Sequence, residues 1–256
     1  MVTALVTGAS SGFGVDFAHI LASKGYDLII VARRKDKLEE VSRNVADKYG
    51  VKVRIIDMDI SGFDAAVKLY DLTKDENIEV LINNAGFGMY DLFISQDAAK
   101  VDSMIQLNIA TLTALTNLFL KDMVKKDSGY ILNVASFAGF NPMPSYAAYG
   151  GSKAYVMNFS VALATELKET GSKVKVSAFC PGYTNTEFVA VAGQKRSEFV
   201  NRTIGESYPA ALEAVNGLFK GKAIVMPRFI NKLGALMLKF MSRKKAAETV
   251  FKSIRK

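Results

Sequence analysis

The sequence predicts an α/β protein with a doubly wound, seven-stranded, mostly parallel sheet that helices cover on both faces. Short apolar runs rich in β-branched residues alternate with longer segments of helical period along the chain, which is the pattern of such a sheet. Several of these runs are almost continuously hydrophobic, as expected for strands that are buried on both sides. A chain of 256 residues is long enough to form one domain of this kind.

The elements follow one another in a regular order. The first expected strand covers residues 2–7 and leads through a glycine loop into a helix over residues 13–24. Further strands are expected at residues 27–32, 53–57, 80–83, 130–134, 174–179 and 223–226. Helices, recognised by apolar residues three and four positions apart, are expected at residues 35–49, 63–75, 97–125, 145–169 and 210–219. No linker divides the chain, so we expect a single domain: residues 1–227 form the sheet with its helices, and residues 228–256 a basic amphipathic helical extension.

The composition argues against several kinds of site. Cys180 is the only cysteine and His19 the only histidine, so zinc sites and Ser-His-Asp or Cys-His catalysis are improbable, and no metal is expected. A lone cysteine cannot form an internal disulfide, which suits a reducing compartment. No basic leader precedes the first strand, and no apolar run approaches the ~20 residues of a membrane span. We therefore expect a cytoplasmic protein.

The positive charge is concentrated at the C-terminus. The chain has a net charge of +8. Residues 228–256 contain nine basic residues and one acid, whereas the rest of the chain has equal numbers of basic and acidic residues. The lack of net charge outside residues 228–256 argues against nucleic-acid binding. The same segment places six apolar residues along one face of an expected helix, with lysines opposite: Phe229, Leu233, Leu236, Met237, Phe240 and Met241. We favour the interpretation that this helix covers a substrate cleft or an oligomer interface. The alternative is weak peripheral contact with anionic lipid.

The first strand runs into "TGASSGFG", residues 7–14, and then into a helix. Glycines let the backbone approach a pyrophosphate, and the helix N-terminus offers free N–H groups and a positive dipole end. The spacing differs from G-x-G-x-x-G, and no Lys-Ser/Thr follows, which excludes a P-loop NTPase. An ordinary glycine-rich turn remains the alternative, but the position in the first βα loop favours a nucleotide in a Rossmann-type fold.

The second strand ends in "IIVARRKDK", with Arg33 and Arg34 where an NAD site normally has an acid. Arginine can hold the 2′-phosphate oxygens of NADP bidentately. The sequence therefore predicts NADP(H) as the cofactor.

Several motifs together closely resemble the classical short-chain dehydrogenases/reductases. They are "TGASSGFG", "NNAG" (residues 83–86), Asn108, Ser136 in "NVASFAG", Tyr149 and Lys153 in "YGGSK", and "PGYTNT" (residues 181–186). By this resemblance, Asn108, Ser136, Tyr149 and Lys153 form a catalytic tetrad. Ser136 and Tyr149 would hold the substrate carbonyl oxygen, and Tyr149 would donate the proton. Lys153 would bind the nicotinamide ribose and lower the tyrosine pKa, and Asn108 would anchor a water in the proton relay.

The resemblance also implies a set of cofactor-binding residues. Asp59 and Ile60 would flank the adenine, and Asn84 would meet the adenosine ribose side. The residues along the nicotinamide half would be Pro181, Gly182, Thr184 and Thr186. The full set is Gly8, Ser10, Ser11, Gly12, Phe13, Gly14, Arg33, Arg34, Asp59, Ile60, Asn84, Ala85, Gly86, Tyr149, Lys153, Pro181, Gly182, Thr184 and Thr186. The assembly expected for such a protein is a homodimer or homotetramer.

Helical spacing decides between two tyrosines near Lys153 in "SYAAYGGSK". Tyr149 lies four residues before Lys153, so the two side chains share one helix face about 6 Å apart along the axis. Tyr146 lies nearly two turns away and is expected to line the pocket or to pack at the helix start. A free tyrosine has a pKa of about 10 and needs a nearby cation for acid–base work near neutral pH. Gly150 and Gly151 are expected to leave room for the cofactor.

The substrate should meet the loops beyond the strand ends, which are apolar and aromatic at residues 87–93, 137–146 and 183–193. The expected function is an NADPH-dependent carbonyl reductase, reversible as an alcohol dehydrogenase, for a hydrophobic ketone or aldehyde. The chain looks most like the subgroup of DltE-like oxidoreductases, 3-ketoacyl reductases and hydroxysteroid dehydrogenases. A non-catalytic NADP-binding sensor or scaffold would have little need for the full tetrad. An epimerase or dehydratase of the extended relatives would usually need a longer C-terminal domain.

Overall fold

The computed structural model describes residues 2–194, 201 and 204–255, and its centre is a seven-stranded sheet in the order β3-β2-β1-β4-β5-β6-β7. The strands are β1 (Thr3–Thr7), β2 (Asp27–Ala32), β3 (Val53–Asp57), β4 (Ile78–Asn83), β5 (Tyr130–Val134), β6 (Lys175–Phe179) and β7 (Ile224–Val225). Every pairing between these strands is parallel. The strand order reverses between β1 and β4, where ligands of such sheets bind.

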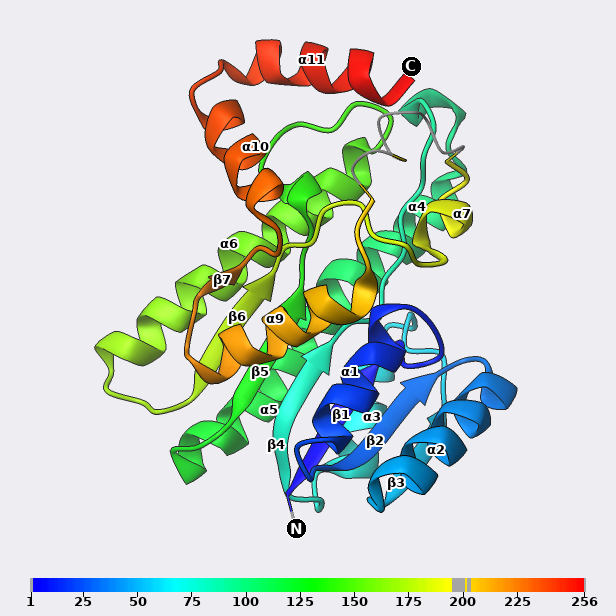
Figure 1. Ribbon diagram of the computed structural model, residues 1–256, viewed down its shortest axis with the longest axis vertical. Helices are drawn as coiled ribbons and strands as arrows, with labels where there is room; N and C mark the ends of the chain where they lie inside the picture. The colour runs from blue at the N-terminus through cyan, green and yellow to red at the C-terminus, as the bar shows by residue number, and fades with distance from the viewer. Residues whose placement is uncertain (1, 195–200, 202–203, 256) are drawn as a thin grey trace.

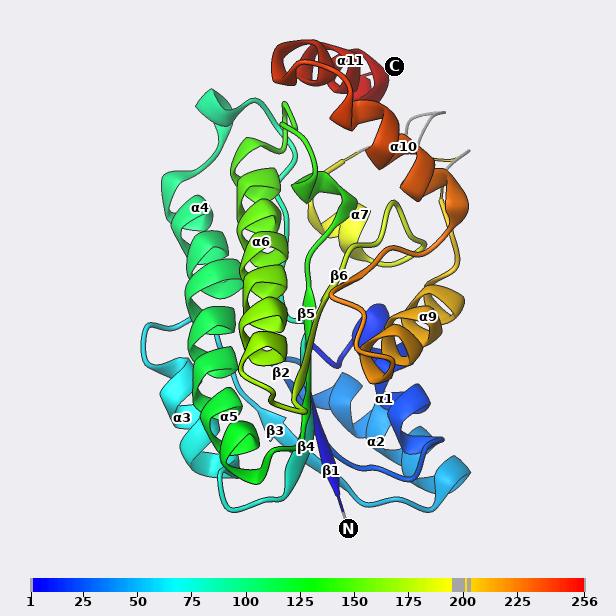
Figure 2. The ribbon, with the colours of Figure 1, turned by 90° about the vertical axis from the view of Figure 1, so that its left-hand side faces the viewer.

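Helices cover both faces of the sheet, as the continuous apolar runs predict. Figure 2 shows α1 (Phe13–Ala22), α2 (Lys35–Tyr49) and α9 (Ser207–Phe219) on one side. The other side carries α3 (Ala65–Thr73), α4 (Ala98–Ile105), α5 (Leu112–Lys126) and α6 (Ala147–Glu169). The expected fold class is confirmed, and the expected helices and strands lie within a few residues of their predicted bounds.

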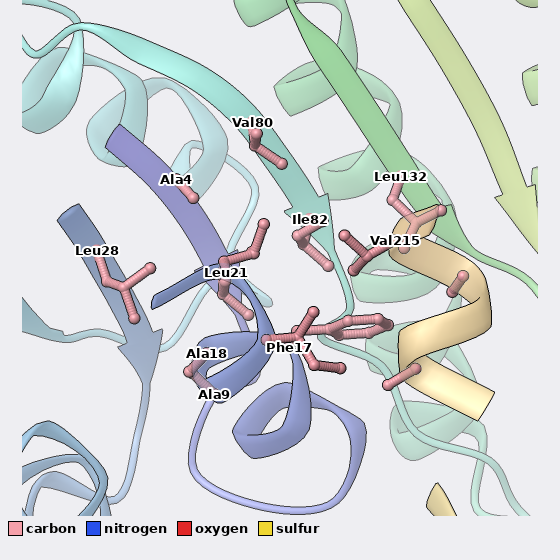
Figure 3. Packing of buried hydrophobic residues seen from close by; sticks show 14 of the residues in the cluster. Ala4, Ala9, Phe17, Ala18, Leu21, Leu28, Val80, Ile82, Leu132 and Val215 are labelled. Atoms are coloured by element: carbon pink, nitrogen blue, oxygen red, sulfur yellow. The ribbon is translucent and has the colours of Figure 1, made fainter. Parts of the chain in front are cut away.

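The strands send alternate side chains into two cores. Ala4 and Val6 of β1 belong to the cluster under α1 and α9, whereas Leu5 belongs to the cluster on the opposite face, as the two-residue period of a strand requires. Figure 3 shows Phe17 of α1 and Val215 of α9 packed over the strands of the first cluster. Because helices cover both faces of the sheet, most positions of the central strands are apolar.

The expected helix over residues 97–125 has an irregular centre. Between α4 and α5, residues Gln106–Thr111 form a π-helical segment, η2, which places Asn108 in the protein interior. Such π segments frequently occur at functional sites. The continuous helix Ala98–Lys126 is long and apolar enough to cross a membrane, with a mean hydropathy of 1.3, unlike the sequence-based expectation. Core helices share this property, and Leu115 and Phe119 of this helix pack in the core.

The C-terminal extension is two helices rather than the expected one. α10 (Phe229–Lys239) and α11 (Arg243–Arg255) lie at the end of the molecule to which the carboxyl ends of the strands point (Figure 1). Short helical segments in the loops of the described residues include η1 (Phe93–Ser95), η3 (Phe137–Gly139) and α7 (Phe188–Val191). Residues of η3 and α7 line the cavity described next.

Candidate active site

A cavity of about 430 Å³ lies at the carboxyl edge of the sheet. It extends along the glycine loop, the ends of β2, β4 and β5, the start of α6 and the segment around α7. Nearly all of the expected site residues line it: Gly8, Ser10, Ser11, Gly12, Phe13, Arg33, Arg34, Asp59, Ile60, Asn84, Ala85, Gly86, Ser136, Tyr149, Lys153, Pro181, Gly182, Thr184 and Thr186. Gly14 and Asn108 are absent from the lining and contribute in other ways.

The glycine loop is shaped by backbone geometry. Gly8 and Gly12 have φ angles of 67° and 52°, which glycine adopts without the steric penalty of a side chain. Gly14 serves packing instead, because a side chain there would collide with the Gly8 carbonyl oxygen where α1 meets β1. The loop thus opens towards the cavity with the N-terminus of α1 behind it, a geometry that suits an anionic phosphate group.

Thr7 and Asn84 tie the glycine loop to the end of β4. Thr7 Oγ1 accepts from the backbone N–H groups of Asn84 and Ala85, each at 3.0 Å. Asn84 Nδ2 donates to the carbonyls of Thr7 at 2.9 Å and Gly8 at 3.1 Å. The Asn84 amide is therefore occupied in holding the loop, although the residue still lines the cavity. Sequence reasoning missed the role of Thr7.

The two arginines after β2 lie at the cavity rim and are exposed. Arg33 forms an ion pair with Asp59 at 3.7 Å. Arg34 reaches across the cavity to Glu187 at 3.1 Å and also donates to the Ser10 carbonyl at 3.3 Å. Exposed ion pairs contribute little to stability, about 0–1 kcal/mol. Both guanidinium groups are therefore available to an anion beside the glycine loop.

Tyr149 is buried beside Ser136 and Lys153. Burial raises the pKa of Tyr149 well above its usual range, and a hydrogen bond with Ser136 opposes this shift only partly. Lys153 Nζ lies 5.8 Å from the centroid of the Tyr149 ring and donates to the Val134 carbonyl at 2.7 Å. Burial thus dominates the Tyr149 pKa in the protein chain alone, and the phenol stays protonated near neutral pH. The lowering of this pKa by Lys153 stays a prediction. Burial also lowers the pKa of Lys153 to about 8.

Asn108 joins the loop after β4 to helix α6. Its Nδ2 donates to the Phe87 carbonyl at 2.9 Å and to Ser152 Oγ at 3.2 Å, and its Oδ1 accepts from the Phe87 N–H at 3.2 Å. Ser152 Oγ in turn donates to the Tyr149 carbonyl at 2.7 Å. A side chain at Gly86 would lie 2.7 Å from Asn108 Oδ1, so this approach needs glycine. The Asn108 side chain positions backbone here, and its part in a water relay stays a prediction.

Tyr146 has a different environment from Tyr149. It stands at the start of α6 and lines the cavity, as expected, and its hydroxyl donates to Gln194 Oε1 at 2.8 Å. Its ring packs against Tyr90 and Tyr149, with centroids 5.2 and 5.6 Å away. Tyr149 is the tyrosine whose phenol lies beside Ser136 and whose ring lies near Lys153.

The expectation for Gly150 and Gly151 is wrong. Neither residue lines the cavity. A side chain at Gly150 would meet Met143 at 3.0 Å, and one at Gly151 would meet no atom within 4 Å. Successive helical positions are rotated by about 100°, which turns these glycines away from the face that carries Tyr149.

The remaining cavity wall is apolar, as the three loops suggested, but the sequence did not single out its members. They are Leu107, Met143, Phe188, Val189 and Val191, together with Phe87, Phe137 and the ring of Tyr183. Phe188 lies with its ring centroid 5.2 Å from that of Tyr149. Cys180 is fully buried nearby, and burial raises the pKa of its thiol to about 12, so it stays a neutral thiol.

Known proteins are similar to this chain in sequence and fold. Residues 2–197 match the family model described as short chain dehydrogenase. The very-long-chain 3-oxoacyl-CoA reductase-B of Danio rerio is 34% identical over 188 residues, which is 72% of this chain and 60% of that protein. The inactive hydroxysteroid dehydrogenase-like protein 1 of Homo sapiens is 33% identical over 192 residues, 73% of this chain and 57% of that protein. The chain thus spans about three fifths of the length of these curated relatives.

A solved structure gives the likeness in three dimensions. The short-chain dehydrogenase from Sphingobium yanoikuyae in complex with NADPH is 30% identical, with a TM-score of 0.83 over 95% of this chain and 97% of that one. The family match covers most of the sheet, the glycine loop and the tyrosine–lysine helix. The chain therefore belongs to the short-chain dehydrogenase family of oxidoreductases, whose fold binds NAD(P).

Proposed function

We propose that the protein is an NADPH-dependent carbonyl reductase that acts on hydrophobic ketones or aldehydes and runs in reverse as an alcohol dehydrogenase. The observation that carries this proposal is the position of the Tyr149 phenol beside Ser136 in a cavity with an apolar wall. A protonated phenol is a proton donor, and reduction of a carbonyl consumes a proton at oxygen.

The residues at the other end of the cavity fit NADPH. Gly8, Gly12 and the start of α1 form a cradle for a pyrophosphate. Arg33 and Arg34 would hold the 2′-phosphate, because their exposed ion pairs exchange readily for a phosphate. When bound, NADPH supplies a hydride to the carbonyl carbon.

The chain's own residues supply the proton and the positioning. The hydroxyls of Ser136 and Tyr149 would donate to the substrate carbonyl oxygen, as oxyanion-type donors do. Tyr149 then transfers its proton to that oxygen, which completes the alcohol and leaves a phenolate. Protonated Lys153 stabilises this phenolate, and its bond to Val134 leaves two N–H groups for the ribose. Asn108 holds the loop after β4 through Phe87 and helix α6 through Ser152.

The substrate class follows from the apolar wall and from the relatives. Rings and aliphatic side chains beside Tyr149 favour an acyl chain or a fused-ring ketone. The 3-oxoacyl-CoA reductases among the relatives support a 3-ketoacyl thioester, and the hydroxysteroid dehydrogenase-like proteins a steroid-like ketone. We further propose that the enzyme works in the cytoplasm as a homodimer or homotetramer, which light scattering after gel filtration tests.

A screen of NADPH consumption tests the activity directly. It should cover ketones, aldehydes, 3-ketoacyl thioesters and ketosteroids, with the Tyr149→Phe variant as the control. We expect wild-type turnover of at least one hydrophobic carbonyl and loss of turnover in Tyr149→Phe, because the proton donor is gone. NADPH binding, followed by nucleotide fluorescence, should persist in that variant. Complete inactivity together with no NADPH binding would contradict the proposal.

The cofactor preference has its own test. Changing Arg33 and Arg34 to Ala should raise KM for NADPH by at least about tenfold, because one or more charge-assisted hydrogen bonds to the 2′-phosphate, each about 1.5–3 kcal/mol, are lost. KM for NADH should change little. An equal rise for both cofactors would contradict the assignment to NADPH.

A second candidate is a non-catalytic NADP-binding sensor or scaffold, which the inactive human relative favours. Ser136, Tyr149 and Lys153 line one cavity, and Asn108 bonds to Ser152 of the same helix as Tyr149 and Lys153, which argues for catalysis instead. NADPH binding without turnover of any carbonyl in the screen would select this alternative.

A further inference from the structure

Helix α10 carries an apolar face that the rest of the described chain leaves open. We call this set of exposed residues the α10 apolar face: Phe229, Ile230, Leu233, Leu236, Met237 and Phe240. Phe229 is 77% exposed and Phe240 is 83% exposed. At about 100° per residue, the six positions share one third of the helix circumference. Contiguous exposed apolar patches on soluble proteins usually mark an interaction site.

The opposite side of α10 faces the catalytic cleft. Asn231 fills the space beside Gly182, where a side chain would lie 2.7 Å from its Oδ1, and it donates to the Pro227 carbonyl at 2.8 Å. Gly234 lies beside the ring of Phe137. Both Gly182 and Phe137 line the cavity. The helix thus has one side on the cleft wall and the other in solvent.

A second apolar segment is exposed at the same end of the molecule. η1 carries Phe93 and Ile94, of which Ile94 is 91% exposed. In both ribbon views the teal segment around η1 and the red helix α11 lie at the top, beyond the carboxyl ends of the strands (Figures 1 and 2). Apolar groups from two distant parts of the sequence therefore lie at the end that holds the cleft.

Charge selects the kind of surface that would cover this end. The exposed basic residues of α10 and α11 include Lys239, Arg243, Lys244, Lys245 and Lys252, against one acid, Glu248, whereas Lys232 of α10 is paired with Glu213. A second copy docked symmetrically would bring the same positive charge against itself. A nucleic acid would match the charge but would leave Phe229 and Phe240 in water. An anionic lipid surface matches both, since each basic residue near it contributes about 1 kcal/mol and apolar side chains enter the headgroup boundary.

We propose that the α10 apolar face and the basic residues around α11 dock the protein peripherally on an anionic lipid surface. The cleft wall formed by Phe137 and Gly182 then lies directly behind the docked helix. A hydrophobic carbonyl substrate, which partitions into lipid, would enter the cleft from the membrane side; this last consequence rests on the proposed function.

Vesicle sedimentation of the full chain tests the docking. The vesicles contain phosphatidylcholine alone, or phosphatidylcholine and phosphatidylglycerol in equal parts. We expect binding to the anionic vesicles only. Replacing Phe229 and Phe240 by Ser, or Lys244 and Lys245 by Glu, should weaken it by at least about tenfold, because removing either apolar or charge contacts costs more than 1.4 kcal/mol. Phe63→Ser is the matched control, because Phe63 is 94% exposed but precedes α3.

Several results would overturn the lipid proposal. These are no sedimentation with anionic vesicles, equal sedimentation of the Phe229/Phe240 variant, or an equal loss in Phe63→Ser. A Phe229/Phe240 variant that changes the oligomeric state in gel filtration would assign the surface to a second copy instead. Turnover of a small water-soluble ketone should be unchanged in all these variants, which keeps this test separate from the proposed activity.

An independent observation concerns buried polar atoms beside Tyr149. Among the described residues, the Tyr183 hydroxyl and Gln194 Nε2 are buried and complete no hydrogen bond. Gln194 nevertheless lies close enough to Tyr183 to lower the pKa of its phenol, although burial raises that pKa more strongly. The amide is oriented by Tyr146, which donates to its Oε1 at 2.8 Å. Unsatisfied buried polar groups cost about 1–3 kcal/mol each, so a ligand that satisfies them gains affinity.

We infer that the Tyr183 hydroxyl, which belongs to a residue of the cavity wall and has Gln194 beside it, forms a subsite for a second oxygen of the substrate, an inference that rests on the proposed function. A phenol O–H is a hydrogen-bond donor, which suits a carbonyl oxygen. Tyr183 and Tyr149 line the same cavity, so the second oxygen would belong to the same substrate molecule as the reacting carbonyl. A 3-ketoacyl thioester meets this requirement, with the thioester carbonyl two carbons from the ketone.

The test compares two substrates of equal chain length, a 3-ketoacyl thioester and a ketone without the second carbonyl. Tyr183→Phe should lower kcat/KM for the thioester by about tenfold, the effect of one lost hydrogen bond to a buried acceptor, and leave the ketone unchanged. Tyr90→Phe is the control, since the Tyr90 ring also packs on Tyr146. Equal losses for both substrates, or none, would overturn the subsite. Absence of turnover of either substrate by the wild-type protein would instead contradict the proposed activity.

Discussion

At the scale of single residues, burial decides the chemistry of the catalytic pair. Tyr149 and Lys153 are both buried, and burial disfavours the charged form of each. The tyrosine pKa rises and the lysine pKa falls to about 8. The neutral phenol is therefore ready to donate a proton in the reduction direction. Alcohol oxidation needs the phenolate and should accelerate as the pH rises.

Lys153→Met should change how stability depends on pH. Lys153 has a folded-state pKa of about 8 against an ordinary value of 10.5, so the unfolded chain binds more protons between these values. The free energy of unfolding of the wild type should therefore rise as pH increases from about 8 to 10.5. Below pH 8 the destabilisation caused by burying the charged Lys153 ammonium is complete. The variant should lack this rise and be more stable at pH 7, by at most about 3 kcal/mol.

Urea unfolding at pH 7 and pH 10 measures this difference. Loss of the Lys153 bond to the Val134 carbonyl offsets part of the gain at pH 7. The exposed Lys121→Met is the control and should keep the wild-type pH dependence. A Lys153→Met variant that retained the full wild-type rise would show that burial of this ammonium is not its origin.

At the scale of elements, the segment around α7 closes onto the glycine loop. The Thr186 side chain lies 3.2 Å from the position of a side chain at Gly12, and Glu187 pairs with Arg34 at 3.1 Å. The substrate side and the phosphate side of the cavity are thereby joined through one ion pair. Because Arg34 is also the proposed 2′-phosphate ligand, Glu187 competes with the cofactor for the same guanidinium.

Glu187→Gln should therefore tighten the use of NADPH. Removing an exposed competitor worth up to about 1 kcal/mol should lower KM for NADPH about twofold to fivefold, with little change for NADH. Steady-state kinetics at low salt measure the effect, which should shrink at high salt. Glu76→Gln, which breaks the Arg54–Glu76 pair away from the cavity, is the control. A higher KM for NADPH would contradict the competition.

At the scale of the whole molecule, a buried polar network joins the middle of the sheet to its helices. Asn133 of β5 accepts from Asn83 Nδ2 of β4 at 2.9 Å and from Thr116 of α5 at 3.3 Å, and it donates to Ser160 of α6 at 3.0 Å. The network connects four elements that position the catalytic residues. In an otherwise apolar core, such a network favours a single arrangement of these elements.

Asn133→Ala should destabilise the fold by about 3 kcal/mol, because it leaves buried donors unpaired and opens a cavity. The midpoint of urea unfolding measures this loss, and the exposed Asn216→Ala should change it by less than about 0.5 kcal/mol. An equally small effect at Asn133 would show that the network adds nothing to stability.

The sequence by itself determined the fold class and most of the site. Period-two and helical apolar patterns are local properties of the chain, so they predicted the parallel sheet and its helices. The carboxyl ends of parallel strands share one edge, so motifs at those ends were expected to meet, and Gly8, Arg34, Ser136 and Tyr149 do line one cavity.

Only the tertiary structure decided the features that depend on distant neighbours. The raised pKa of Tyr149 depends on burial, which no local pattern measures. Asn108 lies in a π-helical segment that the sequence pattern did not predict. The unpaired Tyr183 hydroxyl and the exposure of Phe229 became visible only once their surroundings were folded. Local patterns fix which elements form, whereas burial and charge are set by what those elements place around each side chain.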